Sequence, residues 1–210
     1  CSSDLSGDVN NDGYSDVIAG TNNGVYINFG SNSGPSSAPD ITLAEGFGNF
    51  GQALASNDVN NDGYDDVIVG EYGYNANEGR VYIYFGGVTM NTTADVILTG
   101  EVSSDFGYAV ASEGDINNDG YGDVIIGAPT YSSAKGRAYA FYGGASMDNT
   151  ADVTITGEHN SDQLGTAINS GDMNNDGYSD VIVGVYGYSG STGRVYVFYG
   201  GSSMDTTSDV

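Results

Sequence analysis

The sequence has very little cysteine, histidine, tryptophan or positive charge. Its 210 residues include one cysteine, one histidine, no tryptophan and four lysines and arginines, against 28 acidic residues and a formal net charge of −24. One cysteine excludes a disulfide within the chain, and one Cys with one His leaves a zinc site unsupported. Without a basic patch the chain is a poor partner for nucleic acid. No apolar run approaches the roughly 20 residues of a membrane span.

The single cysteine stands at the first position, and two interpretations are open. Cys1 either marks a boundary of the chain or carries a lipid, as Cys1-Ser2-Ser3 would in a processed lipoprotein. Only six residues separate Cys1 from the first acidic motif, Asp8 onward. That short spacer favours a boundary over a lipid anchor.

The acidic residues are concentrated in one nine-residue motif that occurs four times. The copies run from Asp8 to Asp16, Asp58 to Asp66, Asp115 to Asp123 and Asp172 to Asp180. Each has oxygen-bearing side chains at positions 1, 3, 5 and 9 and glycine at position 6, where a sharp turn needs it. Ca²⁺ takes six to eight oxygen ligands, partly from backbone carbonyls. The motif therefore predicts about four Ca²⁺ ions, one per copy.

The expected ligands are the side chains at positions 1, 3, 5 and 9 and the backbone carbonyl at position 7. They are Asp8, Asn10, Asp12, Tyr14 and Asp16; Asp58, Asn60, Asp62, Tyr64 and Asp66; Asp115, Asn117, Asp119, Tyr121 and Asp123; and Asp172, Asn174, Asp176, Tyr178 and Asp180. The alternative is a set of plain Asn-Asp-Gly hairpin turns without metal. Five oxygen positions repeated four times favour calcium.

The motif differs from an EF-hand, which needs a bidentate Glu at position 12. Position 12 is Ala19, Val69, Ile126 or Val183, none of which can bind a cation. Each motif continues into a short apolar segment rich in β-branched residues and ending in glycine, which predicts a strand. We therefore interpret the motif as a β-hairpin calcium loop.

The motifs start 50, 57 and 57 residues apart, a period typical of propellers or solenoids. The third repeat shows strand patterns at 106–112, 123–127, 136–144 and 151–157. Four antiparallel strands per repeat predict an all-β propeller of about four four-stranded blades. We expect one domain over residues 1–210, with repeats at roughly 1–46, 47–102, 103–159 and 160–210.

One dipeptide and one tripeptide in the third repeat resemble the conserved elements of a known family. Phe106-Gly107 and Gly127-Ala128-Pro129 resemble the FG-GAP repeats of integrin-α-type β-propellers. The second repeat keeps Phe50-Gly51, the fourth has Leu164-Gly165, and the first lacks the element. The resemblance implies an extracellular or cell-surface calcium-binding propeller. Propellers of this type usually have seven blades, so this chain is a fragment, a small ring or an array completed by another chain.

The two ends of the sequence bear on the number of blades. Residues 1–6 are too short for a full first strand, and Ser208-Asp209-Val210 matches the start of a fourth strand. We therefore expect roughly four blades, one of them cut.

Tyrosines recur in the loops between the second and third strands of the blades. They are Tyr72, Tyr74, Tyr131, Tyr186 and Tyr188. These loops lie opposite the acidic loops, on the face that carries ligand contacts in the family that the chain resembles. The tyrosines therefore either contact a ligand or cover the apolar ends of the blades. Arg80, Arg137 and Arg194 share one repeat position, where we expect them to stack on tyrosine or neutralise carboxylates.

The sequence offers no catalytic constellation, and we expect no enzyme. His159, the only histidine, is interpreted as a solvated loop residue. The favoured function is a module for adhesion or for binding a protein or glycan ligand. The alternative is a structural building block of a surface layer or filament, whose copies assemble through open blade edges.

Overall fold

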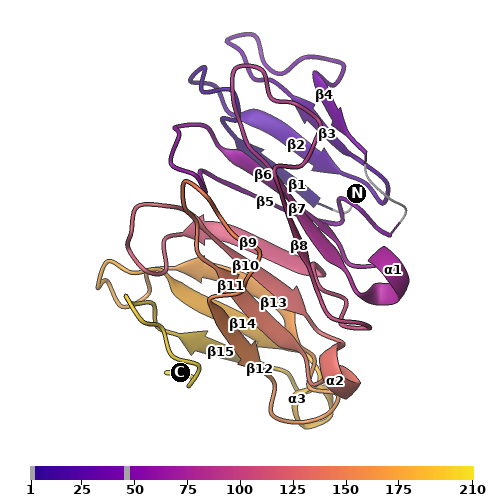
Figure 1. Cartoon of the computed structure of the whole chain (residues 1–210), viewed down its shortest axis with the longest axis vertical. Coiled ribbons are helices and arrows are strands. Elements are labelled where there is room, and N and C mark those ends of the chain that lie inside the picture. Colours follow the sequence, from indigo (N-terminus) through magenta and orange to yellow (C-terminus); the bar gives the residue numbers. More distant parts are fainter. Residues whose placement is uncertain (1–2, 45–47) are drawn as a thin grey trace.

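The computed structural model describes residues 3–44 and 48–210, which form four antiparallel sheets. Figure 1 shows the sheets following one another in chain order, as blades one to four. Over the described residues the first three have four strands and the last has three. The strands are β1 (Ser3–Gly7), β2 (Asp16–Gly20), β3 (Val25–Asn28) and β4 (Ile41–Leu43); β5 (Ala53–Asn57), β6 (Asp66–Glu71), β7 (Arg80–Tyr84) and β8 (Val96–Thr99); β9 (Ala109–Gly114), β10 (Asp123–Ala128), β11 (Arg137–Phe141) and β12 (Val153–Thr156); and β13 (Leu164–Gly171), β14 (Asp180–Val185) and β15 (Arg194–Phe198). The all-β propeller prediction is confirmed.

The core lies between the blades. Successive residues of a strand point to opposite faces of its sheet. In β6, Val67 and Val69 face blade one, whereas Ile68 faces blade three. Every residue of β6 and β10 is buried because a blade covers each face. This explains why the residues that follow the first aspartate of each second strand, such as Val67-Ile68-Val69, form an unbroken apolar run.

The first strand is longer than the sequence led us to expect. β1 has five residues and pairs with β2 along its whole length, from Ser3 opposite Gly20 to Gly7 opposite Asp16. The expectation that the first strand is incomplete was wrong, because a five-residue partner needs only five residues to complete the ladder. Cys1, with its two interpretations, lies outside the described residues.

The Phe-Gly element lies before the first strand of its blade, not in it. Gly107 has a φ of 85°, which takes the chain out of extended geometry, and β9 begins only at Ala109. Phe106 instead makes an isolated parallel bridge with Gly79 of blade two. The predicted strand over 106–112 was therefore wrong at its start. The element attaches each blade to the one before it.

The loops between second and third strands contain a turn that the sequence did not predict. The turns are α1 (Tyr74–Asn77), α2 (Tyr131–Ala134) and α3 (Tyr188–Ser191). Their central residues have positive φ, as in Ser132 (49°) and Ser133 (62°), so each is a left-handed turn. Figure 1 shows α1, α2 and α3 along one side of the array.

Candidate calcium-binding loops and the opposite face

The four acidic motifs form the loops between the first and second strand of each blade, and the side chain at position 1 closes each loop. In blade two, Oδ1 of Asp58 accepts the backbone N–H of Asp62 at 3.1 Å, and Oδ2 accepts that of Gly63 at 2.8 Å. The same pair of bonds occurs in the other three loops. Four copies of the motif thus fold into one local structure.

The side chains at positions 3 and 5 turn toward the same centre. Oδ1 of Asn60 accepts the N–H of Asp62 at 2.9 Å, and Oδ1 of Asp62 accepts that of Tyr64 at 3.1 Å. Nδ2 of Asn60 donates to Oδ2 of Asp62 at 3.0 Å. Gly63, with a φ of 92°, permits the tight winding.

The aspartate at position 9 is buried in every loop. Asp66 is fully buried; its Oδ2 accepts the N–H of Val59 at 2.9 Å, and its Oδ1 accepts that of Gly86 at 2.8 Å. It therefore joins the loop to the end of the third strand. Asp16, Asp123 and Asp180 make the equivalent bonds.

Burial changes the acidity of these carboxyl groups. It raises the pKa of Asp66 and of Asp123 to about 7, against the effect of their two backbone N–H donors and with help from the other aspartates of the loop. Burial also raises the pKa of Asp16. Ionising these groups is unfavourable without a nearby positive charge, and a cation in the loop would supply one.

All twenty predicted ligands lie in the four loops, at the ends where first and second strands meet. Among the residues that the structure describes, no three His, Cys, Asp or Glu side chains form a metal centre by themselves. An ion in these loops would therefore also need the amide oxygen at position 3, the carbonyl at position 7 and water. That mixed oxygen set is the kind that Ca²⁺ accepts.

The loops also connect neighbouring blades, a contact that the nine-residue motif does not predict. The N–H of Gly122 in blade three donates to the carbonyl of Asp58 in blade two at 3.0 Å, and that of Gly144 donates to the carbonyl of Val59 at 2.8 Å. Equivalent bonds join the other neighbouring blades. The pair of glycines after the third strand, as in Gly143-Gly144, is the sequence feature from which these inter-blade hydrogen bonds could have been predicted. The shape of each loop is thus coupled to the position of the next blade.

The loop tyrosines on the opposite side are mostly half-buried. Tyr74, Tyr131 and Tyr188 lie under the guanidinium groups of Arg80, Arg137 and Arg194, at 3.7, 3.6 and 3.8 Å from ring centroid to Cζ. The expectation that these arginines stack on tyrosine is confirmed. Tyr72 packs against Tyr108 at 5.3 Å between ring centroids, and Tyr186 alone of the five is exposed, at 62%.

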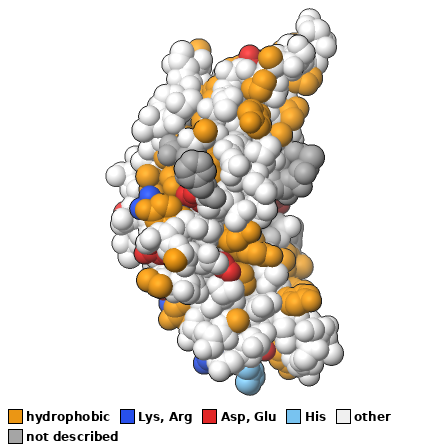
Figure 2. Space-filling model, turned by 90° about the vertical axis from the view of Figure 1, so that its right-hand side faces the viewer, with side chains coloured by type: hydrophobic (Ala, Val, Ile, Leu, Met, Phe, Trp, Pro, Cys, Tyr) orange, Lys and Arg blue, Asp and Glu red, His pale blue; other side chains and the backbone are white. Residues whose placement is uncertain are grey.

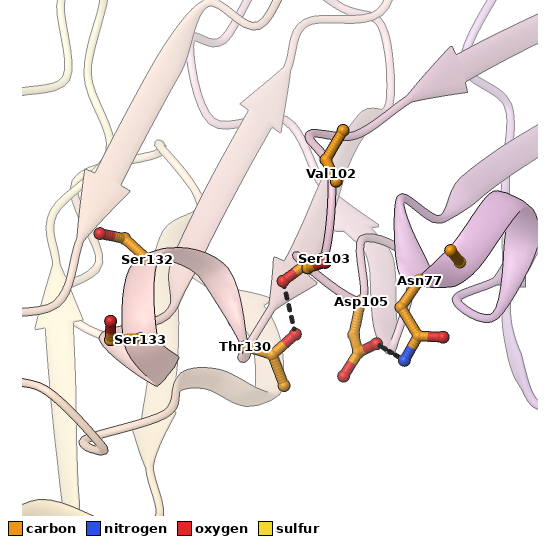
Figure 3. A pocket seen from close by; sticks show the side chains of 8 residues that line it. Asn77, Val102, Ser103, Asp105, Thr130, Ser132 and Ser133 are labelled. Atoms are coloured by element: carbon orange, nitrogen blue, oxygen red, sulfur yellow. Dashed lines mark hydrogen bonds between the residues drawn. The ribbon is translucent and has the colours of Figure 1, made fainter.

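A hollow of about 600 Å³ lies on this side between α1 and α2 (Figure 3). Nδ2 of Asn77 donates to Oδ1 of Asp105 at 2.6 Å, and Oγ1 of Thr130 donates to the carbonyl of Ser103 at 3.1 Å. The hydroxyl groups of Ser132 and of its neighbour Ser133 also line it. No sequence motif marks these polar residues as part of a site.

A second hollow, of about 510 Å³, lies one blade further on, beside α3. Ser161 and Ser189 line it at the repeat positions that Ser103 and Ser132 hold in the first hollow. His159 borders it with a side chain that is 70% exposed, as expected for a loop residue. Figure 2 views this side and shows mainly uncharged surface, with apolar side chains and scattered acidic and basic groups. This face therefore offers hydroxyl and amide groups rather than strong charge.

The family model for the FG-GAP repeat matches residues 50–84, 106–142 and 164–198, about half of the chain. The chain belongs to the FG-GAP repeat family. The resemblance noted from Phe106-Gly107 is thus confirmed. The three matched segments belong to the second, third and fourth repeats of this FG-GAP chain.

The FG-GAP chain is similar to curated proteins over about half of its length. It is 37% identical over 117 residues to integrin alpha-5 of Xenopus laevis, covering 52% of this chain and 11% of that protein. It is 35% identical over 114 residues to integrin alpha-IIb of Mus musculus, covering 49% and 11%. It is 36% identical over 110 residues to phosphatidylinositol-glycan-specific phospholipase D of Bos taurus, covering 45% and 13%. The matched region spans only about a tenth of each relative's length.

Among solved structures, an Agrocybe aegerita lectin matches with a TM-score of 0.58 and 17% sequence identity. The match covers 99% of this chain and 52% of the lectin, whose structure is described as showing specific recognition of non-reducing terminal N-acetylglucosamine. At this identity the likeness shows the fold alone. None of the helices in the described residues is long and apolar enough to cross a membrane.

Proposed function

We propose that this FG-GAP chain is an extracellular or cell-surface calcium-binding propeller module that binds a protein or glycan ligand without catalysing a reaction. The observation that carries the proposal is the identical hydrogen-bonded geometry of the four acidic loops. Each holds two carboxylates and an amide around one turn, with a buried aspartate behind them. The similarity to integrin alpha chains supports the same assignment.

The metal has a structural role in this proposal. Three aspartates in one loop repel one another, and Ca²⁺ relieves that repulsion while holding the first strand to the second. With about 1 mM calcium and a Kd of about 0.1 mM, linkage stabilises the fold by about 1.4 kcal/mol per site. Four independent sites would give about 6 kcal/mol, comparable to the whole stability of many domains. Such affinities suit the millimolar calcium found outside cells.

The ligand would bind on the side of the left-handed turns. Two hollows lined by serine, threonine, asparagine and aspartate recur there at one-blade spacing. Hydroxyl and amide groups can recognise the hydroxyls of a glycan or the backbone of a protein loop. The exposed Tyr186 adds an apolar contact on the same side. The similarity to integrin alpha chains fits a ligand of this kind.

A binding screen of the calcium-loaded chain against immobilised glycans and extracellular-matrix proteins tests the ligand assignment. Ser132→Arg places a large side chain at the first hollow and is expected to weaken binding at least tenfold. The control is Val88→Arg, at a residue that is 74% exposed in the loop after β7, on the side of the acidic loops, which should leave ligand binding unchanged. Equal effects of the two variants would contradict the assignment to this face.

The alternative is a structural building block whose copies assemble through open blade edges. Light scattering in calcium and in chelator separates the two functions. A monomer in calcium favours the binding module, whereas discrete oligomers or long polymers in calcium favour the building block.

A further inference from the structure

The segments that follow the third strands of blades two, three and four contain the same short turn. In blade two, Oδ1 of Asn91 accepts the backbone N–H of Thr93 at 2.7 Å. A side-chain oxygen that bonds to the backbone two residues later is a common way to form a turn. Asp148 and Asp205 hold this position in blades three and four and accept the equivalent N–H at 2.6 and 2.7 Å. The turn therefore forms with either an amide or a carboxylate side chain.

The amide nitrogen of Asn91 is not needed for this turn. The turn uses only Oδ1, and the carboxylates of Asp148 and Asp205 supply the same acceptor. Within the described residues, Nδ2 of Asn91 donates no hydrogen bond, unlike Nδ2 of Asn60, which donates to Asp62 at 3.0 Å. The fold thus leaves this amide nitrogen available for chemistry.

The turn displays Asn91 at the surface. Asn91 and the two threonines that follow it are exposed. The preceding Met90 is partly buried against the apolar cluster between blades one and two, and so anchors the loop. The loop begins near Gly86, whose N–H donates to Asp66, so it lies on the side of the acidic loops. A bulky group on Asn91 would therefore stand away from the two hollows on the opposite side.

We propose that Asn91 is an acceptor for an N-linked glycan. Asn91-Thr92-Thr93 has the spacing that N-glycosylation requires, an asparagine two residues before serine or threonine with no proline between them. No other asparagine in the 210-residue sequence has this spacing. The turn holds residue 93 beside the Asn91 side chain, so the amide and the threonine that the reaction requires are presented together.

The transfer exchanges one bond for another and needs no oxidant or reductant. The donor is an oligosaccharide linked through a diphosphate to a polyprenyl lipid. Nδ2 of Asn91 forms a bond to C1 of the first sugar and loses a proton. The bond from C1 to the diphosphate oxygen breaks, and the lipid diphosphate leaves with the electron pair. Because this modification occurs on exported chains, the inference rests on the proposed extracellular or cell-surface location.

Secretion of the full chain from a eukaryotic host, which supplies the donor and the transferase, tests the proposal. The intact mass is compared before and after treatment with an amidase that removes N-linked glycans and converts the modified asparagine to aspartate. We expect the secreted protein to lose the mass of one oligosaccharide, and its tryptic peptide 81–135 to carry the new aspartate at position 91. An unshifted mass in the folded, secreted protein would overturn the proposal.

Exchanges between the equivalent turns supply matched variants. Asn91→Asp gives blade two the side chain that blades three and four already use, so the thermal midpoint should be unchanged while the mass shift is lost. Thr93→Ala should also remove the shift, whereas Thr92→Ala should keep it. Asp148→Asn places an amide two residues before Thr150 and should add a second glycan. A shift that survives Asn91→Asp, or an Asp148→Asn protein that gains no glycan, would overturn the argument from the shared turn.

Calcium titration of the same secreted protein separates this inference from the proposed function. Calcium binding without a glycan would reject Asn91 as an acceptor and leave the calcium-binding module intact. A glycan on a protein that binds no calcium would support the acceptor site and contradict the proposed module.

Discussion

Two glutamates, one buried and one exposed, accept the same tyrosine hydrogen bond in neighbouring blades. Glu71, at the end of β6, is 1% exposed and accepts the hydroxyl of Tyr82 at 2.6 Å and the N–H of Gly48 at 3.1 Å. In blade three the equivalent hydroxyl, of Tyr139, donates to Glu101, which is 45% exposed and also pairs with Arg137. The same bond therefore has a buried acceptor in one blade and a solvated acceptor in the next.

This difference gives the first prediction. Tyr82→Phe leaves a buried carboxylate without its hydroxyl donor and should lower the free energy of unfolding by about 1–3 kcal/mol. Tyr139→Phe should cost about 1 kcal/mol or less, because water can replace the hydroxyl at Glu101. Urea unfolding of both variants measures the difference, and equal losses would contradict the burial argument.

The calcium loops give a prediction at the position 5 aspartate. Asp62→Ala removes one expected ligand and should reduce the number of bound Ca²⁺ ions by one, as measured by calorimetric titration. Glu113→Gln removes a negative charge from an exposed residue just before another loop and should leave the stoichiometry unchanged. An Asp62→Ala protein with undiminished stoichiometry would show that the second loop was wrongly assigned.

The buried aspartates predict how stability depends on pH. Asp66 and Asp123 have folded-state pKa values of about 7, raised by burial from 3.8. Their contribution is therefore complete below about pH 4 and is lost as the pH rises through 7. In calcium-free buffer the thermal midpoint should fall over that interval. Calcium at 1 mM should reduce the fall, because the cation stabilises the ionised carboxylates.

Two comparisons check this assignment. Asp66→Asn with Asp123→Asn should flatten the slope between pH 4 and 7, whatever their effect on absolute stability. Asp40 should act in the opposite direction at lower pH, because hydrogen bonds from Ser36 and from the N–H of Phe29 lower its pKa. A midpoint that rises from pH 4 to 7 without calcium would contradict the role of the two buried aspartates.

At the scale of the elements, the blades are held together by contacts that require backbone to approach backbone. The second strand of one blade passes within van der Waals distance of the Phe-Gly or Leu-Gly element of the next, and glycine is needed on both sides. The acidic loops add hydrogen bonds between blades at the other end of the strands. Each blade is therefore fixed to its neighbour at both ends.

This packing gives a matched pair of variants. Gly127→Ala places a methyl group 2.0 Å from the carbonyl oxygen of Gly165, and we expect a loss of about 1–3 kcal/mol or more. Gly184→Ala makes the same change in blade four, where the nearest atom is 3.2 Å away, and should cost much less. Chemical denaturation of the two proteins compares them directly, and similar losses would contradict the described inter-blade contact.

At the scale of the whole molecule, three apolar cores between the blades stabilise the array, whereas the negative charges of the four acidic loops repel one another. A net charge of −24 disfavours the compact state through self-repulsion. Four bound Ca²⁺ ions would reduce it by eight units, to −16. We therefore expect chelator to lower the thermal midpoint sharply and calcium to restore it, with magnesium a weaker substitute. A midpoint indifferent to chelator would mean that the four loops are plain hairpin turns.

The sequence alone was sufficient for the features that depend on local pattern. The motif at Asp8, Asp58, Asp115 and Asp172 predicted the repeat and the hairpin loops, and the apolar segments after it predicted the second strands. Phe106-Gly107 indicated the family. Stacking of Arg80, Arg137 and Arg194 on tyrosine also followed from their shared repeat position. These predictions succeeded because their information lies within a few neighbouring residues or in the period itself.

Contacts between blades were decided only by the tertiary structure. The position of Phe106 before its strand, bridged to Gly79, depends on a neighbouring blade that no local pattern specifies. The left-handed turns at α1, α2 and α3 and the partial burial of four of the five loop tyrosines depend on the same packing. Val81 and Val195 occupy one repeat position with one side chain, yet one is fully buried and the other is 58% exposed. Burial is a property of the neighbours that surround a residue, and the sequence of a repeat does not state which neighbours it has.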